Sequence, residues 1–149
     1  MYTTSIKFFI LISIVKFSFE NEQQDPEVDT PLGKIQGLWD VSHEGNSFKK
    51  FKGLKYASVV ERFQDATPID NYPENIYSAK KEGPACPQPV NYPFYSDEDC
   101  LFLNVYVPGD VEVGSNKSVM VWIHGGGWSM GCPEEYNGTP LAGTGAYTV

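Results

Sequence analysis

The residues best suited to chemistry lie in the segment HGGGW at 124–128, which follows the apolar run VMVWI at 119–123. Three consecutive glycines allow the backbone to adopt positive φ angles and to bring bare N–H groups close to a ligand. Amides held in this way at the end of a strand can stabilise the oxyanion of an ester-hydrolysis intermediate, and loss of one such donor costs about 2.7–4 kcal/mol of transition-state stabilisation. A purely structural turn and a phosphate loop are the alternatives, although a phosphate loop requires a Gly-Lys-Ser sequence or a following helix, and the sequence has neither.

A second pattern, GWSMG at 127–131, overlaps the glycine run and matches the G-x-S-x-G of a nucleophile elbow. An elbow needs a buried strand directly before the serine and a helix directly after it. Here the apolar run leads first into the three glycines, and the residues CPEE at 132–135 make only a weak helix start. We therefore interpret Ser129 as a loop residue and expect the nucleophile to lie beyond Val149.

The elements that must position the glycine run are β-strands. Residues 100–107 alternate between two faces, which predicts a strand that ends at Pro108-Gly109. Residues 119–123 are continuously apolar, which predicts a strand buried on both faces of a sheet. Upstream, residues 34–41 and 47–56 are strand candidates around a turn at 42–46, and together they predict an antiparallel hairpin.

The rest of the chain contains little that favours helix. Six prolines within residues 60–99 exclude long regular elements, so this part is predicted to be mostly loop. Buried strands without covering helices make an incomplete sheet, and we therefore expect the chain to be a truncated part of a larger fold.

The composition and the net charge indicate a globular protein and bear on which partners it can bind. The 149 residues are 41% apolar and carry a net charge of −8, with acidic and basic residues interspersed. This composition is typical of a globular protein, and the absence of a basic stripe makes nucleic acid an unfavourable partner.

The N-terminus has the features of a secretory signal. Lys7 precedes an apolar run at 8–15 that is too short to span a bilayer, which predicts a signal peptide over residues 1–19 and a polar segment over 20–29. An amphipathic or buried N-terminal helix is the alternative, and no other segment could cross a membrane.

Export to an oxidising compartment would allow the cysteines to form a disulfide and two sequons to be glycosylated. Cys86 and Cys100 are separated by 13 residues, a comfortable loop for a disulfide worth about 3 kcal/mol. Cys132 is left as a buried free thiol or as the partner of a cysteine outside this chain. Asn116 and Asn137 begin candidate glycosylation triplets, although Pro140 weakens the second.

The segment EDCLFLNVYVP at 98–108 closely resembles the signature that type-B carboxylesterases and cholinesterases carry ahead of their oxyanion loop. Further segments fall in the family's order and extend the resemblance over residues 30–142: PLGKIQG at 31–37, FKGLKYA at 51–57, RF at 62–63, CPQ at 86–88, YNG at 136–138 and LA at 141–142. The resemblance implies an α/β class, with residues 30–149 forming the incomplete N-terminal portion of an α/β-hydrolase fold. In that fold, antiparallel N-terminal strands lead into a central, mostly parallel sheet.

The resemblance also implies roles for individual residues. Gly126 and Gly127 would donate two oxyanion-hole amides, while a third donor would follow the nucleophilic serine beyond this chain. Trp128 would line the acyl side of the gorge or serve only in packing. His124 would be structural and would hold the glycine loop.

Two further pairs match structural features of the family. Cys86 and Cys100 match its first disulfide. Arg62 and Glu98 match a partly buried salt bridge beneath the active-site loop, which is a stronger indication of local specificity than of stability.

The activity implied is hydrolysis of a small-molecule carboxylic ester by a secreted serine hydrolase. A Ser-His-Glu triad would lie beyond the chain, no metal or organic cofactor is implied, and the 149 residues alone would be inactive. The alternative is a non-catalytic, cholinesterase-like adhesion or binding protein. In cholinesterases the corresponding loop is long and carries a choline-binding Trp. The loop between Cys86 and Cys100 is short and contains no Trp, so this departure from the family makes acetylcholine a poor candidate substrate.

Overall fold

The computed structural model describes residues 23–88 and 93–144. The predicted signal peptide at 1–19 lies outside the described residues. The regular structure of the described chain is mainly β-strand, with strands β1 Glu27–Thr30, β2 Gly33–Gln36, β3 Leu38–Val41, β4 Ser47–Lys55, β5 Ala57–Ser58, β6 Thr67–Pro68, β7 Ile76–Ser78 and β8 Phe102–Pro108. The only helical elements in these ranges are the 3₁₀ turn η1 Pro133–Glu135 and the single-turn helix α1 Thr139–Gly143. Helix is therefore scarce in the described residues, as the sequence predicted.

The predicted hairpin is present as β3 and β4, which pair antiparallel around the turn at 42–46. The prediction of one continuous strand over residues 34–41 is wrong, because the chain divides at Gly37 into β2 and β3, which belong to different sheets. A side chain at Gly37 would collide with the Lys50 carbonyl oxygen and with the Phe51 ring. Only glycine therefore lets the chain pass this closely over β4 as it changes sheets.

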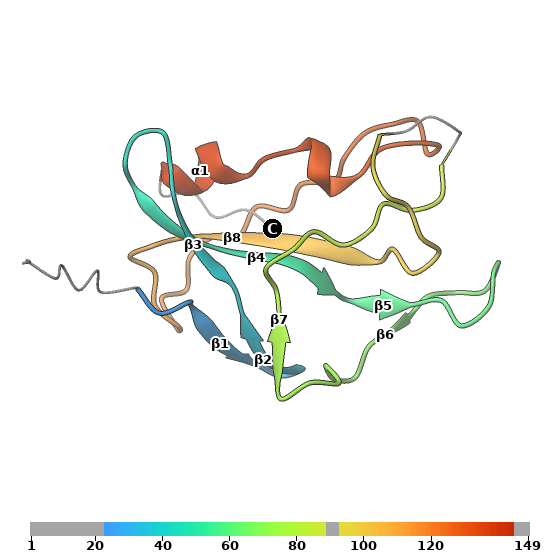
Figure 1. The fold of residues 1–149 in the computed structure, drawn as a ribbon, viewed down its shortest axis with the longest axis horizontal. Helices are drawn as coiled ribbons and strands as arrows, with labels where there is room; N and C mark the ends of the chain where they lie inside the picture. The colour runs from blue at the N-terminus through green and yellow to red at the C-terminus, as the bar shows by residue number, and fades with distance from the viewer. Residues whose placement is uncertain (1–22, 89–92, 145–149) are drawn as a thin grey trace, which may run out of the picture.

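Strand β8 forms where the alternating pattern predicted it and pairs antiparallel along the length of β4, giving the sheet order β3-β4-β8. The register shifts between Phe51 and Leu54 at a bulge that contains Gly53, whose φ is 64°. The second sheet, β1-β2-β7, joins β1 antiparallel and β7 parallel to β2. In Figure 1 this smaller sheet lies on one side of β4 and β8, and α1 lies on the other.

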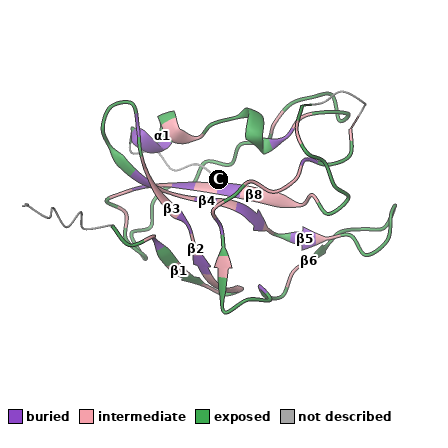
Figure 2. Ribbon diagram, in the orientation of Figure 1, coloured by how far each residue is buried: buried purple, intermediate pink, exposed green. Residues whose placement is uncertain are grey.

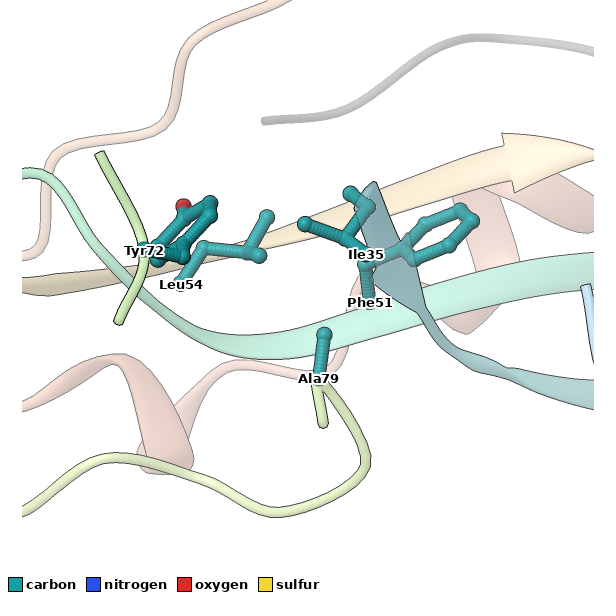
Figure 3. Packing of buried hydrophobic residues seen from close by; sticks show 5 residues of the cluster. All are labelled: Ile35, Phe51, Leu54, Tyr72 and Ala79. Carbon is teal, nitrogen blue, oxygen red and sulfur yellow. The ribbon is translucent and has the colours of Figure 1, made fainter. Parts of the chain in front are cut away.

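Both faces of the β4–β8 pair are therefore covered. On one face, a cluster of buried residues fills the space toward β2 and β7: Ile35, Phe51, Leu54, Tyr72 and Ala79 (Figure 3). Leu103, Val105 and Val107 of β8 pack against this cluster, as their alternation indicated. On the opposite face, Tyr106 packs with Phe48 and with Ala142 of α1.

The prediction of a buried strand at 119–123 is wrong for the described structure. These residues lie outside every strand, and their side chains are exposed, with Ile123 at 82%. A buried strand requires neighbours on its edges and cover on its faces, and the sheet described here ends at β8. Figure 2 shows the contrast between the buried positions of β4 and β8 and the mostly exposed chain that connects β8 to α1.

The intervening residues 60–99 are mostly loop, as predicted, and contain only the short strands β6 and β7. Within the described ranges, no helix has the length and apolar character needed to cross a membrane.

Candidate functional site

The glycine turn, defined here as residues 125–131, is built from backbone angles that favour glycine. Gly126 and Gly127 have φ angles of 128° and 61°, and Gly131 has a φ of 115°. A side chain at Gly126 would collide with the Met130 carbonyl oxygen. The turn therefore depends on glycine at this position for both conformation and space.

Hydrogen bonds close the turn on the carbonyl side of Gly126. Its oxygen accepts from the Ser129 and Met130 amides at 3.1 and 3.2 Å. Within the described ranges, the N–H groups of Gly126 and Gly127 donate to no acceptor, and both residues are exposed. Two adjacent amides are thus exposed and without an acceptor among the described residues.

The two ends of the turn meet at Gly131. A Cβ atom there would lie 2.5 Å from His124 Nδ1 and 2.6 Å from the Gly125 carbonyl oxygen. The same imidazole nitrogen lies 2.8 Å from that carbonyl oxygen. His124 thus belongs to the base of the turn.

Gln88, which lies 43 positions earlier in the chain, also contacts Gly131. Its side-chain nitrogen donates to the Gly131 carbonyl oxygen at 3.0 Å, and its side-chain oxygen accepts from the Gly131 amide at 2.9 Å. The sequence motifs assign no role to Gln88, although this residue is part of the CPQ segment at 86–88. Gln88 follows Cys86 by two positions, so it lies next to the disulfide.

The Cys86–Cys100 disulfide is present, with an S–S distance of 2.04 Å and a Cα–Cα distance of 4.9 Å. Cys132 is a free thiol in the described chain and is 2% exposed. Burial raises the pKa of this thiol, although hydrogen bonds from the backbone at Glu135 and Glu134 oppose the change. A thiol in this environment is poorly reactive at neutral pH.

Ser129 lies within the glycine turn, and its hydroxyl group donates to the Gly126 carbonyl oxygen at 3.2 Å. The element that follows is the three-residue turn η1, which is too short to support a nucleophile elbow. This arrangement agrees with the interpretation of Ser129 as a loop residue.

Two tryptophans in or near the glycine turn are exposed in the described chain. The Trp128 side chain is fully exposed and has a φ angle of 63°. Trp122 is 61% exposed and packs at a tilt against Tyr136, with 5.5 Å between ring centroids. Trp128 thus remains a candidate substrate contact with no partner ring in the described residues.

Arg62 and Glu98 form an ion pair, with 3.2 Å between Arg62 Nε and Glu98 Oε1. The side chains are 69% and 61% exposed, so the pair is not partly buried here as the resemblance implied. An open hollow beside it is lined by Lys55 and residues 58–62 and 97–99, none of which belongs to the glycine turn. The pair therefore sits apart from the candidate oxyanion site.

The two candidate glycosylation residues, Asn116 and Asn137, are exposed and lie outside the strands. Asn137 also accepts a hydrogen bond from the Thr139 amide at 3.0 Å, just before α1. Both side chains have the surface position that a glycan acceptor needs, and their modification stays a prediction.

Comparison with known proteins places these features in a family. Residues 24–149 match the family model described as the carboxylesterase family. A carboxylic ester hydrolase of Bombus ignitus is 34% identical over 145 residues, covering 91% of this chain and 26% of that protein. Carboxylesterase 3 of Homo sapiens is 34% identical over 146 residues, with coverage of 86% and 25%.

Solved structures of esterases also resemble this chain. A PNB esterase aligns with a TM-score of 0.70 and 32% identity, covering 84% of this chain and 27% of the esterase. A thermophilic PNB esterase gives the same values. Because these esterases have the α/β-hydrolase fold, the predicted N-terminal portion of that fold is confirmed. The chain spans about a quarter of the length of the relatives it matches.

Proposed function

Because the chain belongs to the carboxylesterase family, we propose that the complete protein hydrolyses small-molecule carboxylic esters by a serine mechanism. The observation that carries this proposal is the pair of adjacent amides at Gly126 and Gly127, which have no acceptor among the described residues. Fixed backbone N–H groups without an acceptor of their own are the donors that an oxyanion hole needs.

In this proposal the serine hydroxyl attacks the ester carbonyl carbon while a histidine removes its proton and a glutamate orients that histidine. The carbonyl oxygen becomes an oxyanion, and the amides of Gly126 and Gly127 donate hydrogen bonds to it. The triad and the third oxyanion donor would come from outside the 149 residues. The chain by itself would then hold part of an oxyanion hole without a nucleophile and would be inactive.

The local chemistry supports a site rather than a general-purpose turn. Hydrogen bonding occupies the Gly126 carbonyl oxygen three times, from two amides and the Ser129 hydroxyl group. The amides of Gly126 and Gly127 have no acceptor among the described residues. These two donors can therefore hydrogen-bond an anion.

The second candidate is a non-catalytic adhesion or binding protein of the same fold. It is favoured by the steric need for glycine at Gly126 and Gly131, where a side chain would meet Met130 or His124. A protein without catalytic activity would still keep these glycines, because the turn needs them in order to fold. The two candidates differ in whether a nucleophilic serine follows elsewhere in the complete protein.

We further propose that the protein is secreted. The Cys86–Cys100 disulfide is stable in an oxidising compartment, and the relatives include venom carboxylesterase-6 of Apis mellifera, 30% identical over 152 residues. The exposed positions of Asn116 and Asn137 are compatible with N-glycosylation there.

The test is to purify the complete protein and measure hydrolysis of p-nitrophenyl acetate and covalent labelling by a fluorophosphonate probe. The proposal predicts turnover and stoichiometric labelling, with neither for residues 1–149 alone. A complete, folded protein that shows no turnover and no labelling would refute the esterase and favour the binding protein.

A further inference from the structure

We propose that Gln88 is a positioning residue that holds the glycine turn in the geometry needed to bind the oxyanion; this inference rests on the proposed function. Its side-chain amide pairs with both backbone groups of Gly131, at 3.0 and 2.9 Å. A primary amide presents an N–H donor and a carbonyl acceptor side by side, and these match the carbonyl oxygen and the N–H group of one backbone residue. No charge is involved, so the contact acts through geometry.

The position of Gly131 explains how this contact reaches the oxyanion donors. Gly131 is packed so closely against His124 Nδ1 and the Gly125 carbonyl oxygen that no side chain fits between them. Holding Gly131 therefore also holds the residue directly before Gly126. Between these two ends, the Ser129 and Met130 amides bind the Gly126 carbonyl oxygen and orient its peptide.

Gln88 is itself held in place by a nearby covalent link, the Cys86–Cys100 disulfide. The Cys86–Cys100 disulfide lies two residues before it, and Ala85 is 4% exposed and hydrogen-bonded to Tyr95 and Asp97 through its backbone. Cys100 in turn leads directly into β8 at Phe102. The turn, which has no strand of its own in the described chain, is thus connected through Gln88 to the central β4–β8 pair.

The consequence is specific to catalysis. Oxyanion donors act on the transition state more than on the bound ester, so a displaced turn lowers kcat and leaves KM nearly unchanged. A displacement of about 1 Å is enough to cost up to about 100-fold in rate. If a residue contributed only to overall stability, its substitution would change neither kcat nor KM of the molecules that remain folded.

The experiment compares Gln88→Met with Gln64→Met in the complete protein. Methionine is close in size to glutamine but cannot pair with a peptide. Gln64 is an exposed glutamine that bonds only to Glu61 among the described residues, which makes it the matched control. For Gln88→Met we expect kcat for p-nitrophenyl acetate to fall about 10- to 100-fold with KM changed less than about twofold. Gln64→Met should match the unmodified protein.

A second readout is independent of activity. Cys132 follows Gly131 and is buried, so its alkylation reports local opening of this segment. We expect Gln88→Met to accelerate alkylation of Cys132, followed by peptide mass spectrometry, by about tenfold relative to Gln64→Met. Gln88→Glu keeps the acceptor for the Gly131 amide and loses the donor, and it provides a second variant should methionine prevent folding. It should also lower kcat and accelerate alkylation.

The outcomes separate the two proposals. A fall in kcat with faster alkylation supports both. If the unmodified protein hydrolyses esters while the Gln88 variants keep its kcat and its alkylation rate, Gln88 is not a positioning residue. Should the unmodified protein lack hydrolysis while Gln88→Met still accelerates alkylation, the contact holds the turn and the esterase proposal fails. A fall in kcat without faster alkylation, matched by an equal loss of folded protein, would make Gln88 a general stability contact and would overturn the inference.

Discussion

The side chain of Asn104 in β8 holds the bulge of β4 by accepting a 2.9 Å hydrogen bond from the Gly53 amide. Its nitrogen donates to Glu82 Oε2 at 2.5 Å, and the other carboxylate oxygen of Glu82 lies 2.5 Å from Lys52 Nζ. Asn104 is 8% exposed, so its polar atoms need these partners. The register of the β4–β8 pair is therefore tied to a polar network rather than to apolar packing alone.

We expect Asn104→Leu to lower the free energy of unfolding by about 1–3 kcal/mol, because the Gly53 amide and the Glu82 carboxylate lose a partner in a site with little water. Urea unfolding followed by fluorescence measures the change. Asn71→Leu is the control, since Asn71 is exposed and, among the described residues, bonds only to the adjacent Tyr72 carbonyl oxygen. Equal midpoints for the two variants would show that the network contributes nothing to stability.

Replacement of Gly126 by alanine should abolish the geometry of the proposed oxyanion hole. The added methyl group would collide with the Met130 carbonyl oxygen, and the residue would have to hold a φ of 128°. We expect kcat of the complete protein to fall at least about 100-fold. Gly125→Ala is the matched change, because a Cβ there meets nothing within 4 Å and the φ is not positive. Similar losses in both variants would contradict the assignment of Gly126.

Removal of the disulfide should affect both stability and the glycine turn. We expect the double change Cys86→Ala and Cys100→Ala to lower the free energy of unfolding by about 2–4 kcal/mol, because the unfolded chain regains the freedom of the closed loop. Since Gln88 lies two residues from Cys86, kcat should also fall at temperatures where the variant remains folded. Thermal unfolding and initial rates, measured on the same samples, check the two effects separately. Retention of full kcat would show that the disulfide does not support the turn.

Alkylation of Cys132 should have an unusual dependence on pH. The thiolate is the reactive form, and burial raises the pKa of this thiol above its ordinary value. At pH 8 the folded protein should therefore react more slowly than the same protein in urea. In urea the thiol has the ordinary cysteine pKa of about 8.5. The rate in the folded state should continue to rise at pH values where the rate in urea has levelled off. Coinciding profiles would mean that Cys132 is accessible to solvent.

Much of the fold followed from local patterns in the sequence. The turn between β3 and β4, the alternation of β8 and the prolines of residues 60–99 each depend on neighbouring residues, and the structure contains all three. The order of short motifs also predicted the family, because several matches in sequence are specific where one is not. The disulfide was predictable because the loop between the cysteines has a suitable length.

The sequence by itself thus predicted the hairpin of β3 and β4, strand β8, the family and the glycines on which a turn with open amides depends. Only the tertiary structure decided which distant groups meet. The division at Gly37 depends on a backbone from β4, and the contact of Gln88 with Gly131 joins residues 43 positions apart. The exposure of residues 119–123 was not predictable either, because an apolar run specifies a need for cover and says nothing of whether neighbouring strands supply it. Periodicity and φ preferences are local properties of the chain, whereas such contacts depend on how separate elements pack.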